Sequence, residues 1–215
     1  MKSLLNLFFP QQCLFCDIFQ DKDILCSNCL ESLHFLESEF NAPYLRQRWF
    51  NQAYSVLAYE GQVVQAIASL KYKRQFHLIR FFVDLLAAKL TQMPSYDLIV
   101  PVPLHWYRLI SRGYNQAGLL SKAVGKKMQL KYDLFALKRS RNIPAQVGLG
   151  REERLKNVTQ AFMVRPNRVS RLAGKSILLL DDVMTTGATV NECAKVLVKN
   201  GKCGKVDILT VARTL

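Results

Sequence analysis

The fold of this chain is decided by the stretch Ile177-Leu178-Leu179-Leu180-Asp181-Asp182-Val183-Met184-Thr185-Thr186-Gly187-Ala188-Thr189. Its four leading apolar residues are typical of a buried parallel strand, and a helix is expected to follow at 190–198. A turn between a strand and a helix directs free backbone N–H groups at an anion. Asp181 and Asp182 would repel a phosphate, but they can accept hydrogen bonds from sugar hydroxyls or approach a hydrated Mg²⁺. The stretch therefore predicts a site for a phosphorylated sugar.

The order of apolar run, acid pair and Thr-Gly-x-Thr turn resembles the signature of the type I phosphoribosyltransferases, whose shared ligand is 5-phosphoribosyl 1-pyrophosphate (PRPP). The resemblance implies that Asp181 and Asp182 read the ribose 2′- and 3′-hydroxyls, and that Gly187 is the residue of closest approach to the ligand. It further implies that the 5-phosphate is taken by the loop Thr185, Thr186, Gly187, Ala188 and Thr189. The alternative is an ordinary strand, turn and helix with Thr caps, which the filled motif disfavours.

A second segment that bears on the site is Pro101-Val102-Pro103, which ends an expected strand that begins at Leu98. Open α/β sheets place their ligands at this edge. In the phosphoribosyltransferase fold the loop after the first strand contacts pyrophosphate, so the resemblance implies that Pro101, Val102 and Pro103 fix this loop. Arg108 and Arg112 would then reach the pyrophosphate oxygens, with a surface charge as the alternative for each.

Two further residues near these segments stay open. Lys71 is expected to contact either the substrate or a strand. His105 is expected to be a supporting or surface histidine rather than a general base, because the sequence shows no partner for it.

Four cysteines form a set near the start of the chain: Cys13, Cys16, Cys26 and Cys29. Two Cys-x-x-Cys pairs at this spacing predict one tetrahedral Zn²⁺ site that closes a segment too short to bury a core of its own. Four thiolates leave no open coordination position, so the zinc is expected to be structural. Disulfides are the alternative, and the expected cytoplasmic location favours metal. Cys193 and Cys203 are assigned no role.

A wider set of residues looks like the ComF/GntX branch, whose members also begin with a four-cysteine ribbon. The set is Leu70-Lys71-Tyr72, Val100 to Leu104, Arg108, Arg112 to Gln116, Gln146, Leu149, Arg154, Asn157 and Ala161-Phe162. This resemblance spans the whole chain. It implies an accessory factor of DNA uptake in natural transformation, which binds PRPP with Mg²⁺ and single-stranded DNA, with a competence helicase or an inner-membrane DNA channel as partner.

The charge of the chain is concentrated in one segment. Residues 99–180 hold sixteen basic and three acidic side chains, out of a net charge of +14 for the whole chain. A surplus of this size favours a polyanion over a single phosphate group, and nucleic acid is the natural candidate. We expect Arg139, Arg141, Arg151 and Arg154 to bind it. A solvated basic surface is the alternative.

The order of expected elements indicates an α/β fold. Strands are expected at 53–59, 98–103, 161–164, 177–180 and 206–212, and helices at 30–40, 63–70, 76–90, 112–130 and 190–199. This alternation predicts a type I phosphoribosyltransferase-like, doubly wound parallel sheet with a small N-terminal zinc ribbon. The expected division is a ribbon-like segment at 1–40 and a phosphoribosyltransferase-like domain at 41–215.

The sequence also bears on location and catalysis. No run of about eighteen apolar residues exists, and the opening apolar residues stop at Pro10, so we expect a cytoplasmic protein, at the inner face of the membrane if it touches one. Catalytic phosphoribosyltransferases enclose the base with a hood, and in this sequence only residues 41–95 are expected to be able to form one. An active transferase on an unidentified nucleophile and a GntX-like metabolic accessory protein therefore stay as alternatives.

Overall fold

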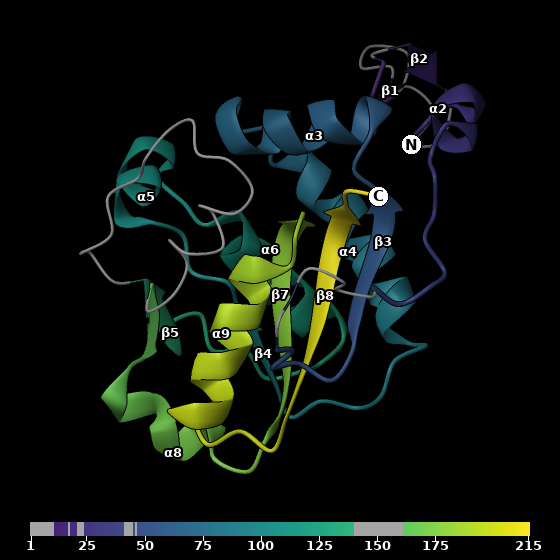
Figure 1. Ribbon diagram of the computed structural model, residues 1–215. Coiled ribbons are helices and arrows are strands. Elements are labelled where there is room, and N and C mark those ends of the chain that lie inside the picture. Colours follow the sequence, from purple (N-terminus) through teal and green to yellow (C-terminus); the bar gives the residue numbers. More distant parts are fainter. Residues whose placement is uncertain (1–10, 17, 21–23, 41–44, 46, 140–160) are drawn as a thin grey trace.

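A computed structural model describes residues 11–16, 18–20, 24–40, 45, 47–139 and 161–215 of this chain. Its centre is a parallel sheet in the order β3-β8-β7-β4. The strands are β3 Ala53–Ala58, β4 Leu98–Pro101, β7 Ser176–Met184 and β8 Lys205–Arg213. Figure 1 shows that β3, β7 and β8 point the same way. The parallel α/β sheet expected from the sequence is confirmed.

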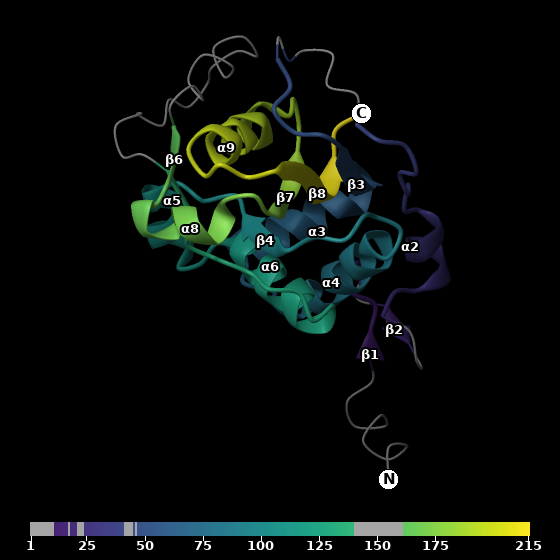
Figure 2. The same cartoon turned by 90° about the horizontal axis from the view of Figure 1, so that it is seen from below.

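Helices cover both faces of this sheet: α3 Gly61–Tyr72, α4 His77–Leu90, α6 Gln116–Lys127 and α9 Ala188–Lys199. Figure 2 shows α9 on one face and α4 and α6 on the other. In β7, Leu178 and Leu180 belong to the core on the α4 and α6 side, whereas Ile177 and Leu179 belong to the core on the α9 side. Because every side chain of the run 177–180 is buried, the run is apolar without alternation. Burial of each of these side chains contributes roughly 1.5–3 kcal/mol to the stability of the fold.

The smaller elements lie at the margins. They are β1 Gln11–Gln12, β2 Phe19–Gln20, α2 Ser27–Glu31, α5 Trp106–Arg112, β5 Leu137–Arg139, β6 Phe162–Val164, a 3₁₀ turn Pro166–Arg168 and α8 Val169–Leu172. Within the described ranges, no helix is both long and apolar enough to cross a membrane.

The helix expected at 30–40 is wrong. Helix α2 ends at Glu31, and the residues that follow run antiparallel along β3, with Phe35 bridging Leu57. The Leu36 N–H donates to the Val56 carbonyl at 2.9 Å. β3 lies at the edge of the sheet, and this pairing satisfies edge groups that would otherwise face solvent.

Three other expected elements also differ. The helix expected at 112–130 begins only at Gln116, as α6, because Gly113 adopts a left-handed conformation (φ 81°) that ends the preceding helix α5 at Arg112. The strand expected at 161–164 exists as β6 but pairs antiparallel with β5 in a sheet of its own. β7 in turn continues past Leu180 to Met184, because β8 pairs with it over that length.

Candidate functional site

The candidate site lies at the carboxyl edge of the parallel sheet, where neighbouring strands end at different points. Pro101 is the last residue of β4 and pairs with Leu180, and the Val102 N–H donates to the Leu180 carbonyl at 2.9 Å. β7 continues beyond this point through Asp181 and Asp182. The acid pair therefore stands beside the loop that follows β4, and α3 passes above the same edge (Figure 1).

A cavity of about 290 Å³ opens at this place, and we call it the edge pocket. The residues predicted from the sequence that line it are Lys71, Val102, Pro103, Arg108, Arg112, Asp181, Asp182, Thr185 and Thr189. Those lining it without having been predicted for the site are Tyr59, Leu104, Asn115, Gln116, Ala117 and Val183. The edge pocket thus draws on segments from β3 to α9.

A smaller space of about 50 Å³, the turn hollow, adjoins the edge pocket between the end of β7 and the start of α9. Gly187 and Ala188 line it, and Asp181, Thr185 and Thr189 line both spaces. Thr186 supports the turn, since its Oγ1 accepts a hydrogen bond from the Ala188 N–H at 3.4 Å. The first amides of α9 lie at this hollow, and helix N-termini attract anions.

Gly187 is required by the shape of the turn. Its φ of 76° lies in the left-handed region, and a Cβ there would meet Cε1 of Phe40 at 3.0 Å. Both facts exclude a larger side chain without local movement. The glycine therefore sets the shape of the turn that borders the turn hollow.

The two acids differ in their surroundings. Asp182 is buried, and its Oδ2 lies 3.0 Å from Nζ of Lys71, at the end of α3. Asp181 has no such partner among the described residues; its Oδ1 accepts the Asp182 N–H at 2.9 Å. Burial, and then the negative charge of Asp182, raise the pKa of the Asp181 carboxyl well above its usual 3.8, while Lys71 opposes the shift. A cation or hydroxyl groups from a ligand would relieve this repulsion.

Arg112 is held in place from two sides. It is only 9% exposed, its Nη1 donates to Gln116 at 3.3 Å, and its Nη2 donates to the Tyr72 hydroxyl at 3.0 Å. Its guanidinium also lies 4.8 Å from the centre of the Tyr72 ring. Asn115, just before α6, donates from Nδ2 to the Val102 carbonyl at 3.0 Å and so fixes the loop after β4. An arginine fixed in this way can bind an anion with little loss of side-chain entropy.

Arg139 also lines the edge pocket, although the sequence assigned it to nucleic acid. It lies at the end of β5, with its guanidinium 5.4 Å from the centre of the Phe162 ring. Burial, and then the positive charge of Arg108, lower the pKa of Arg139. The other arginines assigned to nucleic acid, Arg141, Arg151 and Arg154, lie outside the described residues.

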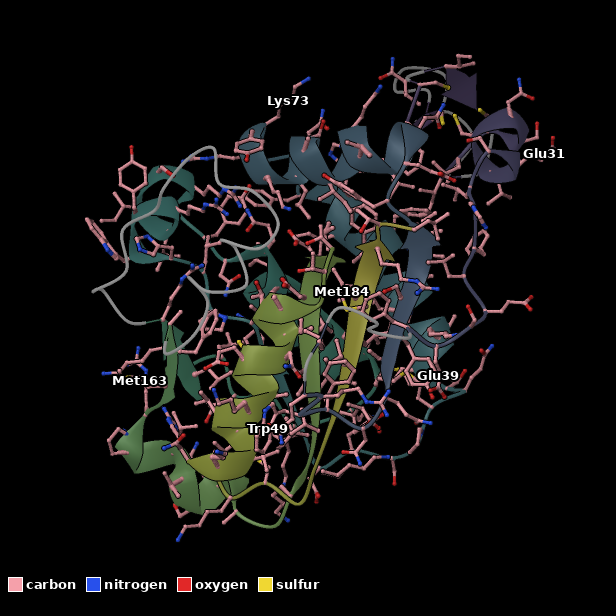
Figure 3. The ribbon with its side chains drawn as sticks, viewed as in Figure 1. Glu31, Glu39, Trp49, Lys73, Met163 and Met184 are labelled. Atoms are coloured by element: carbon pink, nitrogen blue, oxygen red, sulfur yellow. The ribbon has the colours of Figure 1, made fainter. Side chains whose placement is uncertain are left out.

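The four N-terminal cysteines form a second candidate site. The sulfur atoms of Cys13, Cys16, Cys26 and Cys29 all lie within 4.8 Å of one another. Figure 3 shows sulfur atoms gathered beside α2, near Glu31. Two backbone N–H groups point at Cys13 Sγ, from Phe15 at 3.5 Å and from Cys26 at 3.4 Å. Such donors stabilise a thiolate, which is the form that binds metal.

The thiols of this cluster differ in acidity. Burial opposes ionisation of Cys13, but the N–H groups of Cys26 and Phe15 lower its pKa to about 6. Burial, and then the neighbouring sulfurs, raise the pKa of Cys29 to about 12. A tetrahedral zinc–thiolate site with Zn–S bonds of about 2.3 Å has sulfurs about 3.8 Å apart. The cluster can therefore hold a metal ion after a small contraction.

Known proteins resemble this chain over most of its length. The sequence model of the family described as "Phosphoribosyl transferase domain" matches residues 117–214. Competence protein F of Haemophilus influenzae is 28% identical over 90% of this chain and 93% of its own length. DNA utilization protein YhgH of Escherichia coli is 30% identical over 75% of this chain and 71% of its own length. The chain belongs to the ComF family.

In this ComF-family chain the matched domain contains the acid pair, the turn hollow and α9. The chain has the type I phosphoribosyltransferase-like fold that its sequence predicts. Among solved structures, adenine phosphoribosyltransferase from Thermoanaerobacter pseudethanolicus aligns with a TM-score of 0.41 and 15% identity, over 66% of this chain and 83% of its own. The unassigned Asn115 and Gln116 lie three and four residues after Arg112 in the ComF-like run, and that proximity is the signal by which they could have been found.

Proposed function

We propose that the edge pocket binds PRPP together with Mg²⁺. Asp181 and Asp182 would accept hydrogen bonds from the ribose hydroxyls, and the turn hollow would take the 5-phosphate. Arg108 and Arg112 would bind the pyrophosphate beside the fixed loop after β4. The observation that carries the proposal is the convergence of an acid pair, a helix start and several cations on one pocket of about 290 Å³.

The cations of the pocket support an anionic ligand. Lys71, Arg108, Arg112 and Arg139 line it against the two aspartates, so the lining carries a positive surplus when all ionise. Mg²⁺, when bound with PRPP, would supply positive charge next to the acid pair. Carboxylate oxygens are ligands that Mg²⁺ accepts, directly or through water. Calorimetry with PRPP, with and without Mg²⁺, tests this, and equal heats from ribose 5-phosphate and PRPP would argue against a pyrophosphate subsite.

The four-cysteine cluster is the proposed site of one structural Zn²⁺, held by Cys13, Cys16, Cys26 and Cys29. Soft thiolate donors at this spacing suit zinc, and the closed set leaves no position for a substrate. The zinc would stabilise the start of the chain and take no part in chemistry.

The proposed cellular role is in DNA uptake during natural transformation, as a cytoplasmic accessory factor at the inner face of the membrane. The names of the relatives, a competence protein and a DNA utilization protein, support it. The basic surplus of residues 99–180 supports single-stranded DNA as a partner. A competence helicase or an inner-membrane DNA channel would be the protein partner.

A transformation assay tests this role. The host gene would be replaced by an allele carrying Asp181→Asn and Asp182→Asn, and transformation frequency would be compared between natural uptake and electroporation. We expect the allele to lower natural transformation alone. Equal frequencies for the allele and the parent strain would leave the GntX-like metabolic role in first place.

An active phosphoribosyltransferase is the second candidate, and α3 favours it. This helix comes from the range 41–95 expected to supply any hood, and it passes over the carboxyl edge of the sheet (Figure 1). Pyrophosphate release measured across a panel of nucleobases would distinguish a transferase from a protein that only binds PRPP.

We expect Gly187→Ala to weaken PRPP binding at least ten-fold and to lower the free energy of unfolding by about 1 kcal/mol, since alanine is strained at positive φ. Gly174→Ala is the matched control: its φ is 70°, but a Cβ there would meet nothing within 4 Å. Both variants should lose stability in urea unfolding, and Gly187→Ala should lose somewhat more because its Cβ would also meet Phe40. Only Gly187→Ala should lose affinity in calorimetry, and equal affinities would contradict a ligand in the turn hollow.

A further inference from the structure

A wider groove of about 540 Å³ lies beside the edge pocket, and we call it the side groove. It lies where the turn between α3 and α4 meets the junction of α5 and α6. Arg74 and Arg112 line it, and none of the acidic residues that the structure describes does. Arg112 also lines the edge pocket, so the two spaces share one guanidinium. The groove is therefore suited to an anion that extends beyond the edge pocket.

Aromatic rings with open surfaces stand at this groove. Phe76 is 45% exposed, and its ring meets the ring of Tyr114 edge-on, with 4.9 Å between centroids. The Tyr114 hydroxyl donates to the Leu70 carbonyl and so anchors the pair to α3. Tyr72 does not line the groove, but it is 71% exposed and contacts Arg112, which does. Rings fixed in place with exposed surfaces are platforms on which planar bases stack.

Arg74 supplies a cation at the same place. Its φ of 57° is unusual for a residue with a side chain, and it turns the chain from α3 into α4. Its Nη2 lies 3.7 Å from the position that a Cβ on Gly113 would occupy, so the guanidinium lies across that glycine. Arg74 is exposed and, within the described residues, makes no ion pair. Its charge is therefore available to a ligand.

We propose that the side groove is the docking surface for single-stranded nucleic acid, with a phosphate at Arg74 and a base stacked on Phe76. The proposal rests on the proposed function, in which the chain handles single-stranded DNA, and it gives the strand a location that the sequence did not indicate. Arginines without acids match a phosphate backbone, and open aromatic rings match unpaired bases. A duplex keeps its bases stacked inside, so it cannot use the rings.

The first test compares two substitutions of the same kind. Arg74→Gly removes a positive charge and also relieves the strained backbone, so loss of binding could not be attributed to unfolding. Lys202→Gly is the matched control, because Lys202 is also basic, exposed and left-handed (φ 55°), but lies in the turn between α9 and β8 at the other end of the sheet. Binding of a fluorescein-labelled oligothymidylate would be measured by anisotropy at several salt concentrations.

Arg74→Gly should weaken binding and reduce the steepness of log K against log salt by about 0.7, the value for one phosphate of a single strand. Lys202→Gly should change neither quantity. Phe76→Leu should weaken binding about five-fold or more without changing the slope, since stacking releases no counterions. Phe135→Leu, at an exposed ring near β5, should have no effect. Thymidine monophosphate and a duplex of equal length should compete poorly.

The proposal is overturned if Arg74→Gly and Phe76→Leu bind the oligonucleotide like the parent protein. It is also overturned if Phe135→Leu alone weakens binding, because the strand would then lie on the β5 side. A groove that binds a protein partner and no oligonucleotide would overturn it as well. PRPP stabilisation would be measured in the same variants. If Arg74→Gly binds PRPP normally but no longer binds the oligonucleotide, the two proposals are separated. If PRPP does not stabilise the parent protein, that result counts against the edge pocket alone.

Discussion

Asp181→Asn is expected to stabilise the ligand-free protein and at the same time to abolish its stabilisation by PRPP and Mg²⁺. Burial and the charge of Asp182 raise the pKa of Asp181 in the folded state. The pKa of this carboxyl is about 3.8 in the unfolded chain and higher in the folded protein. The protonated carboxyl therefore contributes its full stability below about pH 3.8, and this contribution is lost as the pH rises through the folded-state pKa. Asparagine removes the repulsion and keeps the acceptor for the Asp182 N–H. We expect a gain of about 1 kcal/mol at neutral pH, shrinking toward acid pH.

The neighbouring substitution should act with the opposite sign. Asp182→Asn also ends the repulsion between the two acids, but it leaves Lys71 without its partner. The Oδ2 of Asp182 lies 3.0 Å from Lys71 Nζ, and the lysine and aspartate side chains are 19% and 12% exposed. The loss should be about 1–2 kcal/mol, between the values for exposed and for fully buried pairs. PRPP at about one hundred times its dissociation constant stabilises a parent protein by about 2.7 kcal/mol, and both variants should lose that increment.

Urea unfolding at acid and neutral pH, with and without PRPP and Mg²⁺, measures all of these quantities. Asp84→Asn is the control, because Asp84 forms an exposed ion pair with Lys127 on the α4 side of the sheet. It should change stability by less than about 1 kcal/mol and keep the PRPP increment. A folded Asp181→Asn variant that PRPP still stabilises fully would show that this acid does not hold the ribose.

Removal of one thiol from the cysteine cluster should have the largest effect on stability. We expect one Zn²⁺ per chain, and Cys13→Ser to lose it together with several kcal/mol of stability, since zinc binding to such sites is folding free energy. Cys193→Ala changes a buried core thiol in α9 that lies outside the four-cysteine cluster, and it should cost only about 1 kcal/mol. Elemental analysis and thermal unfolding measure both. Protein purified without chelators that contains no zinc, or that carries a Cys13–Cys16 disulfide, would contradict the zinc site.

The parallel sheet could be predicted because its signals are local. Ile177 to Leu180 read as a doubly buried strand within a few residues, and the acid pair follows directly. The segment at 30–40 shows the opposite case. Leu33, Leu36 and Phe40 have helical spacing and are all buried, but hydrogen bonds to β3, some twenty residues further along, decide their conformation. Spacing alone cannot distinguish a buried helix face from a buried extended segment that pairs with a strand.

The candidate site was predictable to the same extent. The residues that belong to contiguous motifs, such as Asp181, Asp182 and Thr185, line the pocket as the motif indicates. Lys71 was left open between substrate and strand, because its partner Asp182 is distant in the sequence. α5 was missed because Trp106, Tyr107, Leu109 and Ile110 are exposed, so its apolar residues do not follow the pattern of a buried face. Arg139 is positioned at the pocket by the pairing of β5 with β6, and no local sequence pattern predicts that pairing.

Helix α3 has twelve residues, about 18 Å of helix, and runs from the side of β1 and β2 to the side of α5 (Figure 1). Burial raises the pKa of Cys29, and Gln62 in the first turn of α3 acts against that shift, while Lys71 in the last turn pairs with Asp182. Lys73, just beyond its end, points away from the sheet (Figure 3).

The division at residue 40 stays a prediction, but α3 makes the two sides of it thermodynamically dependent on each other. A metal bound by the cysteines and PRPP bound in the edge pocket would each favour the same docked helix. By linkage, each then reduces the free-energy cost of retaining the other, with no contact between the two ligands. We therefore expect the amide hydrogens of α3 to show the largest decrease in exchange rate when either ligand is added.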